Sequence, residues 1–200
     1  IHSVEKAAAG RADIVTTVSE ITAQECSQFH GRNVDIVTPN GFEKGFTPSS
    51  DEEYEELRQA SRKKLIAAAE SMGGEPVAKD AILVGIAGRY EYRNKGVDVF
   101  IDSLAKFAGN SPEGRTVHAF IMIPSGHNGP DKDLEAKLAG SGSDYVTRTS
   151  HYLMNPDSDA IMRRLDDCGM DNARGSRVKV YFLPSYLNGN DGIFDMTFYE

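Results

Sequence analysis

Residues 81–107 read AILVGIAGRYEYRNKGVDVFIDSLAKF, and this stretch decides the fold. Its first seven residues form a continuous apolar run, which is typical of a central parallel strand buried on both faces. Over residues 97–107 apolar side chains recur at helical spacing, so we expect an amphipathic helix there. A charged loop, residues 88–96, joins the two elements. Strand, loop and helix in this order predict the start of a βαβ unit.

The chain downstream continues the same alternation. Residues 117–123 and 177–183 are apolar runs that each end at a proline, and they predict two further strands. A helix is expected over residues 158–168 between them. Repeated alternation of this kind predicts a right-handed parallel sheet. Residues 125–150 are rich in Gly and Ser and predict one weak helix, over 131–138.

The chain upstream predicts the end of another α/β layer. Helices are expected over 3–12 and 19–30, and short strands over 13–19 and 35–38. A charged helix follows over 51–72 and is ended by two glycines. We therefore expect an α/β protein with Rossmann-like parallel sheets in two domains. Its parts are the end of an N-terminal domain (1–42), a crossover linker and helix (43–80) and the first part of a C-terminal domain (81–200).

Composition excludes several classes of protein. Hydrophobic residues make up 40% and charged residues 26% of 200 residues, which is typical of a globular protein and not of a disordered chain. The net charge of -8 argues against a nucleic-acid partner. The two cysteines, Cys26 and Cys168, form no CxxC motif, so we expect neither a disulfide framework nor a zinc site. No apolar run is long enough for a membrane span, and we expect a cytoplasmic protein.

The loop at residues 88–96 carries the most informative chemistry. Arg89 follows the strand, and Lys95, six residues later, precedes the helix. A guanidinium fork, an ammonium group and the N–H groups of a helix N-terminus together suit a pyrophosphate. The spacing matches neither of the common glycine-rich nucleotide motifs. Solvated surface charges are the alternative interpretation of the same residues.

Several segments resemble the glycogen synthases of the animal and fungal type, a family of retaining glycosyltransferases. The run GRYEYRNKGVDVFIDSLAKF at residues 88–107 carries the resemblance most strongly. Further matching segments, in the same order along the chain, are DIVTTVSEITAQE, DIVTPNGFEKGF, VHAFIMIPSG, TSHYLMNPDSDAIMRRL and RVKVYFLPSYLNGNDGIF.

The resemblance implies a two-domain (GT-B type) enzyme with its active site between the domains. It implies transfer of glucose from a nucleotide diphosphate sugar, usually UDP-glucose, to the non-reducing end of an α-1,4-glucan, with retention and without a cofactor. Arg89 and Lys95 would hold the donor phosphates. No metal is expected, because these cations neutralise the diphosphate and no Asp-x-Asp closes a predicted strand. Uridine and adenosine remain alternatives for the base.

Three other residues are candidates with an open alternative. Tyr186 and Leu187 follow the third predicted strand, where a nucleobase would lie, although ordinary loop packing explains them equally well. His151 lies in the matching TSHYLM segment, and we consider both a place in the substrate cleft and packing under a loop.

A non-catalytic Rossmann-like module that binds a phosphorylated ligand or a protein is the alternative function.

The sequence also departs from the family pattern. The family's glycine-rich loop and histidine would precede Ile1, and its paired glutamates would follow Glu200, so we expect a central fragment that has no catalytic residues and is itself inactive. The segment between Pro124 and Thr149 is shorter than the helical insertion of animal and fungal members. This difference suggests a bacterial-type relative and leaves a homo-oligomer as an open expectation.

Overall fold

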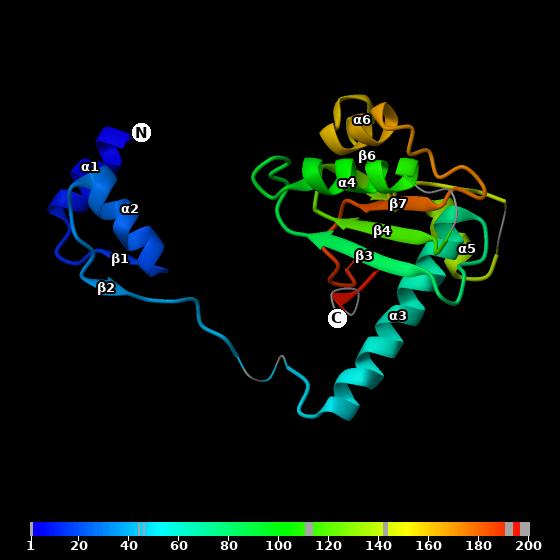
Figure 1. Cartoon of the computed structure of the whole chain (residues 1–200), viewed down its shortest axis with the longest axis horizontal. Coiled ribbons are helices and arrows are strands. Elements are labelled where there is room, and N and C mark those ends of the chain that lie inside the picture. The colour runs from blue at the N-terminus through cyan, green and yellow to red at the C-terminus, as the bar shows by residue number, and fades with distance from the viewer. Residues whose placement is uncertain are drawn as a thin grey trace. The chain divides into compact units, whose positions relative to one another are not determined.

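The computed structural model describes residues 2–43, 45, 47–110, 114–141, 144–190 and 194–196. It divides the chain into two compact units, Ile1–Ser49 and Ser50–Glu200. Figure 1 shows the elements of both units. Each unit is described by itself below.

The first unit contains two helices and two very short parallel strands. They are α1 (His2–Arg11), β1 (Thr16–Thr17), α2 (Glu20–His30) and β2 (Ile36–Val37). Ser19 and Thr22 form a capping box that starts α2, and Gly31 ends it in the left-handed conformation. The predicted helices are confirmed, whereas each strand keeps only two of its predicted residues. None of the described residues in this unit is buried.

The second unit is built on a three-stranded parallel sheet. Its strands are β3 (Ile82–Ala87), β4 (Val117–Met122) and β7 (Val178–Leu183), in the order β3-β4-β7. The predicted βα alternation is confirmed, with helices α3 (Asp51–Gly73), α4 (Val97–Asn110) and α6 (Ala160–Asp167). The chain is therefore an α/β protein with parallel sheets.

Helices cover both faces of this sheet, with α4 and α6 on one side and α3 on the other (Figure 1). Residues Ile101 and Ile161, from α4 and α6, join one hydrophobic core with alternate strand residues such as Ile121. Residues Met72 of α3 and Phe120 of β4 belong to a second core on the opposite face. Side chains alternate between the two faces along a strand, so this arrangement favours the largely apolar runs of β4 and β7.

The expectation that residues 81–87 form a central, fully buried strand is wrong for the described structure. β3 lies at one edge of the sheet, and its residues are only half-buried or exposed. β4 is the central strand, and all six of its residues are buried. An apolar run predicts a strand in a parallel sheet, but strand order depends on pairing between segments distant in sequence.

A small antiparallel ribbon was not expected from the sequence. β5 (His127–Pro130) pairs with β6 (His151–Leu153), and α5 (Lys132–Leu138) lies between them in the chain. A single 3-10 turn, η2 (Pro156–Ser158), precedes α6. The segment HNGP lacks the apolar alternation by which strands are recognised, so the pairing is visible only in three dimensions. Among the described residues, no helix has the length and apolarity needed to cross a membrane.

Candidate functional site

The three parallel strands end side by side, which gathers three loops at one edge of the sheet. The register aligns the last strand residues, Ala87, Met122 and Leu183. The backbone N–H of Ser125 donates to the carbonyl of Pro184 at 3.0 Å and ties two of the loops together. Parallel α/β sheets bind ligands at this carboxyl edge. The candidate site therefore consists of the loops 88–96, 123–126 and 184–190.

The first of these loops presents two cations to solvent. The Arg89 side chain is 77% exposed, and its Nη2 lies 2.9 Å from Oε1 of Glu91. Lys95 is exposed as well, while its backbone N–H donates to the Glu91 carbonyl at 2.9 Å. Gly96, with φ of 70°, makes the left-handed turn that leads into α4. Both predicted phosphate ligands are thus accessible on one loop, and Glu91 is the counterion of one of them.

The N-terminus of α4 does not offer the free N–H groups that the loop pattern suggested. The amides of Val97 and Asp98 donate to the carbonyl of Tyr92 at 3.0 and 3.4 Å. The amide of Val99 donates to the Asp98 carboxylate at 2.9 Å. The loop carbonyl of Tyr92 and the side chain of Asp98 in α4 thus occupy these donors. An anion at this loop would therefore be held by the two cations rather than by the helix end.

The two candidates for the nucleobase site lie in different environments. Tyr186 is 68% exposed and lines a cavity of about 340 Å³ together with Ser125, Asn188 and other residues of the β4 and β7 loops. Leu187 is 2% exposed and packs in the second core. This burial favours the packing interpretation for the Leu187 side chain over a contact with the nucleobase. Tyr186 remains the accessible candidate.

A second cavity of about 330 Å³ adjoins the first at Ser125. Its lining includes Tyr90, which lies in the loop 88–96 (hereafter the cationic loop), and Asp159, which precedes α6. The Tyr90 hydroxyl donates to Oδ2 of Asp159 at 2.9 Å. Sequence reasoning missed both residues as members of the site. The position of Asp159 directly before a helix was a readable N-cap signal, but its distant tyrosine partner was not.

His151 is fully buried and lines neither of the two cavities at this edge. Its Nδ1 lies 2.8 Å from the Ser150 hydroxyl, and its ring meets the edge of His127 with centroids 4.5 Å apart. This position favours the packing interpretation over a place in the substrate cleft.

The acidic residues of the described structure do not form a metal centre. Asp157-Ser158-Asp159 is an Asp-x-Asp sequence, but it spans the turn before α6 rather than a strand end. The Asp159 carboxylate caps α6. In the part of the chain that the structure describes, no three His, Cys, Asp or Glu side chains gather in a way that could hold a metal ion.

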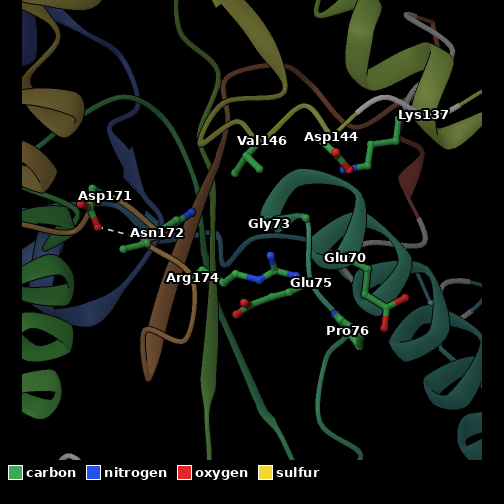
Figure 2. Close-up of a pocket in the computed structure, with 12 residues that line it drawn as sticks. Glu70, Gly73, Glu75, Pro76, Lys137, Asp144, Val146, Asp171, Asn172 and Arg174 are labelled. Atoms are coloured by element: carbon green, nitrogen blue, oxygen red, sulfur yellow. Dashed lines mark hydrogen bonds between the residues drawn. The ribbon is translucent and has the colours of Figure 1, made fainter.

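A cavity larger than these two lies at the opposite edge of the sheet, where the strands begin. It has a volume of about 700 Å³, and its walls come from the end of α3 and the segment that leads into β7 (Figure 2). Glu75 and Arg174 lie close together on one side of it. Buried Lys179 places Nζ 2.8 Å from Oε1 of Glu75. This edge carries a structural ion pair and is separate from the cationic loop.

A parallel sheet with helices on both faces and exposed cations at its carboxyl edge is typical of Rossmann-like domains that bind phosphorylated ligands. Comparison with known proteins gives the family. The model of the glycogen synthase family matches residues 1–137, and the chain belongs to that family. The match ends between Pro124 and Thr149.

Individual relatives agree with this assignment along the whole chain. A glycogen [starch] synthase of Neurospora crassa is 38% identical over 98% of the chain, and one of Dictyostelium discoideum is 36% identical over 100%. Glycogen [starch] synthase isoform 2 of Saccharomyces cerevisiae is 26% identical over 100% of the chain. The chain spans 36%, 29% and 37% of the lengths of these three relatives.

Proposed function

We propose that the protein acts in glycogen synthesis as a glycosyltransferase, moving glucose from a nucleotide diphosphate sugar to an α-1,4-glucan. The donor is UDP-glucose, and the anomeric configuration is retained. The observation that carries this proposal is the exposed pair Arg89 and Lys95 on one carboxyl-edge loop of a glycogen synthase family member. In this scheme the second unit binds the donor, and residues 1–42 are the end of the N-terminal domain.

The chemistry follows from where charge develops. When the bond between the glucose C1 and the diphosphate oxygen breaks, negative charge grows on that oxygen. In this proposal Arg89 and Lys95 neutralise that charge, and fixed cations stabilise a transition state more than they stabilise the ground state. The scheme needs no divalent metal because the cations take that role. Tyr186, beside the 340 Å³ cavity, is the proposed contact for the base.

The experiment compares two arginines of the same loop in the full-length protein. Arg89→Ala should lower kcat/KM for the nucleotide sugar about 100-fold, which corresponds to about 3 kcal/mol of transition-state stabilisation. Arg93→Ala removes another exposed cation of the loop and should change kcat/KM less than twofold. Labelled UDP-glucose and ADP-glucose, each with glycogen, are the donors. Wild-type turnover in Arg89→Ala contradicts the assignment, and equal losses in both variants reduce it to a general charge effect.

A further inference from the structure

One aspartate joins three elements at the carboxyl edge. Asp159 Oδ1 accepts hydrogen bonds from the backbone N–H groups of Ile161 and Met162 at 2.9 and 3.0 Å and thereby caps α6. Its Oδ2 accepts from the Tyr90 hydroxyl at 2.9 Å and from the Ser125 hydroxyl at 3.4 Å. The carboxylate therefore links the cationic loop, the loop after β4 and the start of α6.

The cationic loop has few other attachments to the rest of the unit. Its backbone hydrogen bonds between Arg89 and Gly96 are local, such as Glu91 N–H to the Arg89 carbonyl at 2.7 Å. Two tyrosine rings, Tyr90 and Tyr92, pack against the core beneath it. In the part of the chain that the structure describes, only the first of these two tyrosines has a hydrogen bond at its hydroxyl. The hydrogen bond to Asp159 thus fixes the residue that directly follows Arg89.

The chemistry of this contact makes it a firm anchor. Burial, together with the hydrogen bond to the Asp159 carboxylate, raises the pKa of Tyr90. The hydroxyl therefore stays protonated and donates a hydrogen bond to the carboxylate. The acceptor is in turn held by two amides of α6, which restricts its own movement. Ligand-binding side chains act best when such supporting contacts hold them in place before the ligand arrives.

We propose that Tyr90 is a positioning residue, and that its hydrogen bond to the α6-capping Asp159 holds the donor-phosphate loop, with Arg89 and Lys95, in its binding geometry. This inference rests on the proposed function for the ligand of the loop. Its structural part, the restraint of residues 88–96, is independent of the reaction.

The first test measures the loop itself by hydrogen exchange. Tyr90→Phe removes the hydroxyl and keeps the ring, and Tyr92→Phe is the matched control in the same loop. Amides of residues 88–96 should exchange about tenfold faster in Tyr90→Phe, because the loss of one hydrogen bond changes an equilibrium by about that factor. In Tyr92→Phe they should exchange as in the wild type. Equal exchange in all three proteins overturns the inference, and so does equal acceleration in both variants, because only Tyr90 has the hydroxyl hydrogen bond to Asp159.

The second test links the restraint to donor binding through a double-mutant cycle on kcat/KM for the nucleotide sugar. Tyr90→Phe should cost about tenfold in the wild-type background and less than threefold in the Arg89→Ala background, since positioning matters only while the positioned group is present. Asp159→Asn, which keeps a capping oxygen, should give an intermediate loss. Additive losses contradict positioning. An Arg89→Ala variant with full activity contradicts the proposed function instead, and the exchange measurement still decides the restraint.

Discussion

The Glu91 carboxylate competes with any anionic ligand for the Arg89 guanidinium. The guanidinium is paired with Glu91, and this pair must open before a phosphate can take its place. With the arginine side chain 77% exposed, the ion pair contributes little to stability. Its effect belongs to binding, where it lowers the affinity of the loop for anions.

We therefore predict that Glu91→Gln tightens the binding of UDP. Removing an exposed ion pair worth about 0.2–1 kcal/mol should increase affinity by roughly 1.5- to 5-fold. Titration calorimetry with UDP measures the change, and the gain should shrink as salt screens the pair. Weaker binding in Glu91→Gln would mean that the glutamate supports the site rather than competing in it.

Lys179 presents the opposite situation, because it is a buried charge. It is 1% exposed, and Nζ is held by the Glu75 carboxylate and by the Asn172 carbonyl at 3.2 Å. Asn172 adopts a φ of 59°. Its side-chain amide donates a hydrogen bond to the Val180 carbonyl and accepts one from the Val180 N–H, both at 2.8 Å. Such a network stabilises the fold only while every charge keeps its partner.

Glu75→Gln should lower the free energy of unfolding by about 3 kcal/mol, because it leaves the buried ammonium without its counterion. The hydrogen bond from Lys179 lowers the pKa of Glu75 in the folded chain. The pair therefore stabilises the fold above the unfolded pKa of about 4.3 and loses this contribution as pH falls through the folded value. Urea unfolding at pH 7 and pH 4 should show that the variant loses this acid sensitivity.

The control for this prediction is Glu55→Gln, which breaks an exposed pair with Arg58 and should cost less than about 0.5 kcal/mol. The double variant Glu75→Gln/Lys179→Met should recover most of the loss, since it also removes the buried charge. If Glu75→Gln and Glu55→Gln unfold alike, the buried pair has no special role.

At the scale of elements, two helical glycines have opposite roles. Gly73, the last residue of α3, lies where a Cβ would meet the Tyr181 hydroxyl at 2.8 Å. Tyr181 is fully buried, and its hydroxyl lies 3.1 Å from Nδ1 of His118, so it has little room to move. Gly109, in α4, has nothing within 4 Å of a Cβ. Close helix–sheet packing thus requires a glycine at the first position and not at the second.

Gly73→Ala should destabilise the chain by about 1–3 kcal/mol through overpacking. Gly109→Ala should stabilise it by up to about 1 kcal/mol, because alanine loses less backbone entropy in a helix. Thermal and urea unfolding of the two variants provide the comparison. An unchanged midpoint for Gly73→Ala would show that α3 can move away from the sheet at no cost.

Across the whole molecule, burial is concentrated in the second unit. There the strands β4 and β7 are buried throughout. In the first unit none of the described residues is buried, and large apolar side chains such as Ile21 and Phe29 are 70% and 60% exposed. Little apolar burial is available there to offset the loss of chain entropy.

Hydrogen exchange of the 200-residue chain should reflect this difference. We predict protection factors for α1 and α2 near those of an unfolded chain, whereas amides of β4 and β7 should exchange only on unfolding of the second unit. The measurement is residue-resolved exchange at neutral pH. Protection in α2 as strong as that in β4 would show that the first unit has a stabilising partner.

Periodicity and caps in the sequence determined the elements. Apolar runs gave β4 and β7, and the Ser19 and Gly31 signals bounded α2. These features are local, because a strand or a helix end depends on residues close together in the chain. The strand-to-helix loop likewise indicated the cationic pair Arg89 and Lys95, with solvated surface charges as the alternative, and the matching segments indicated the family.

Only the tertiary structure decided what lies beside what. It placed β3 at the sheet edge, buried Leu187 and His151, and paired β5 with β6. It also brought the Tyr90 hydroxyl to Asp159, 69 residues away in the chain. Each of these contacts depends on packing between segments that are distant in sequence, and the residues involved carry no local signal of their partners. The amino-acid pattern therefore predicts the cations of the candidate site, and the folded chain decides what holds them.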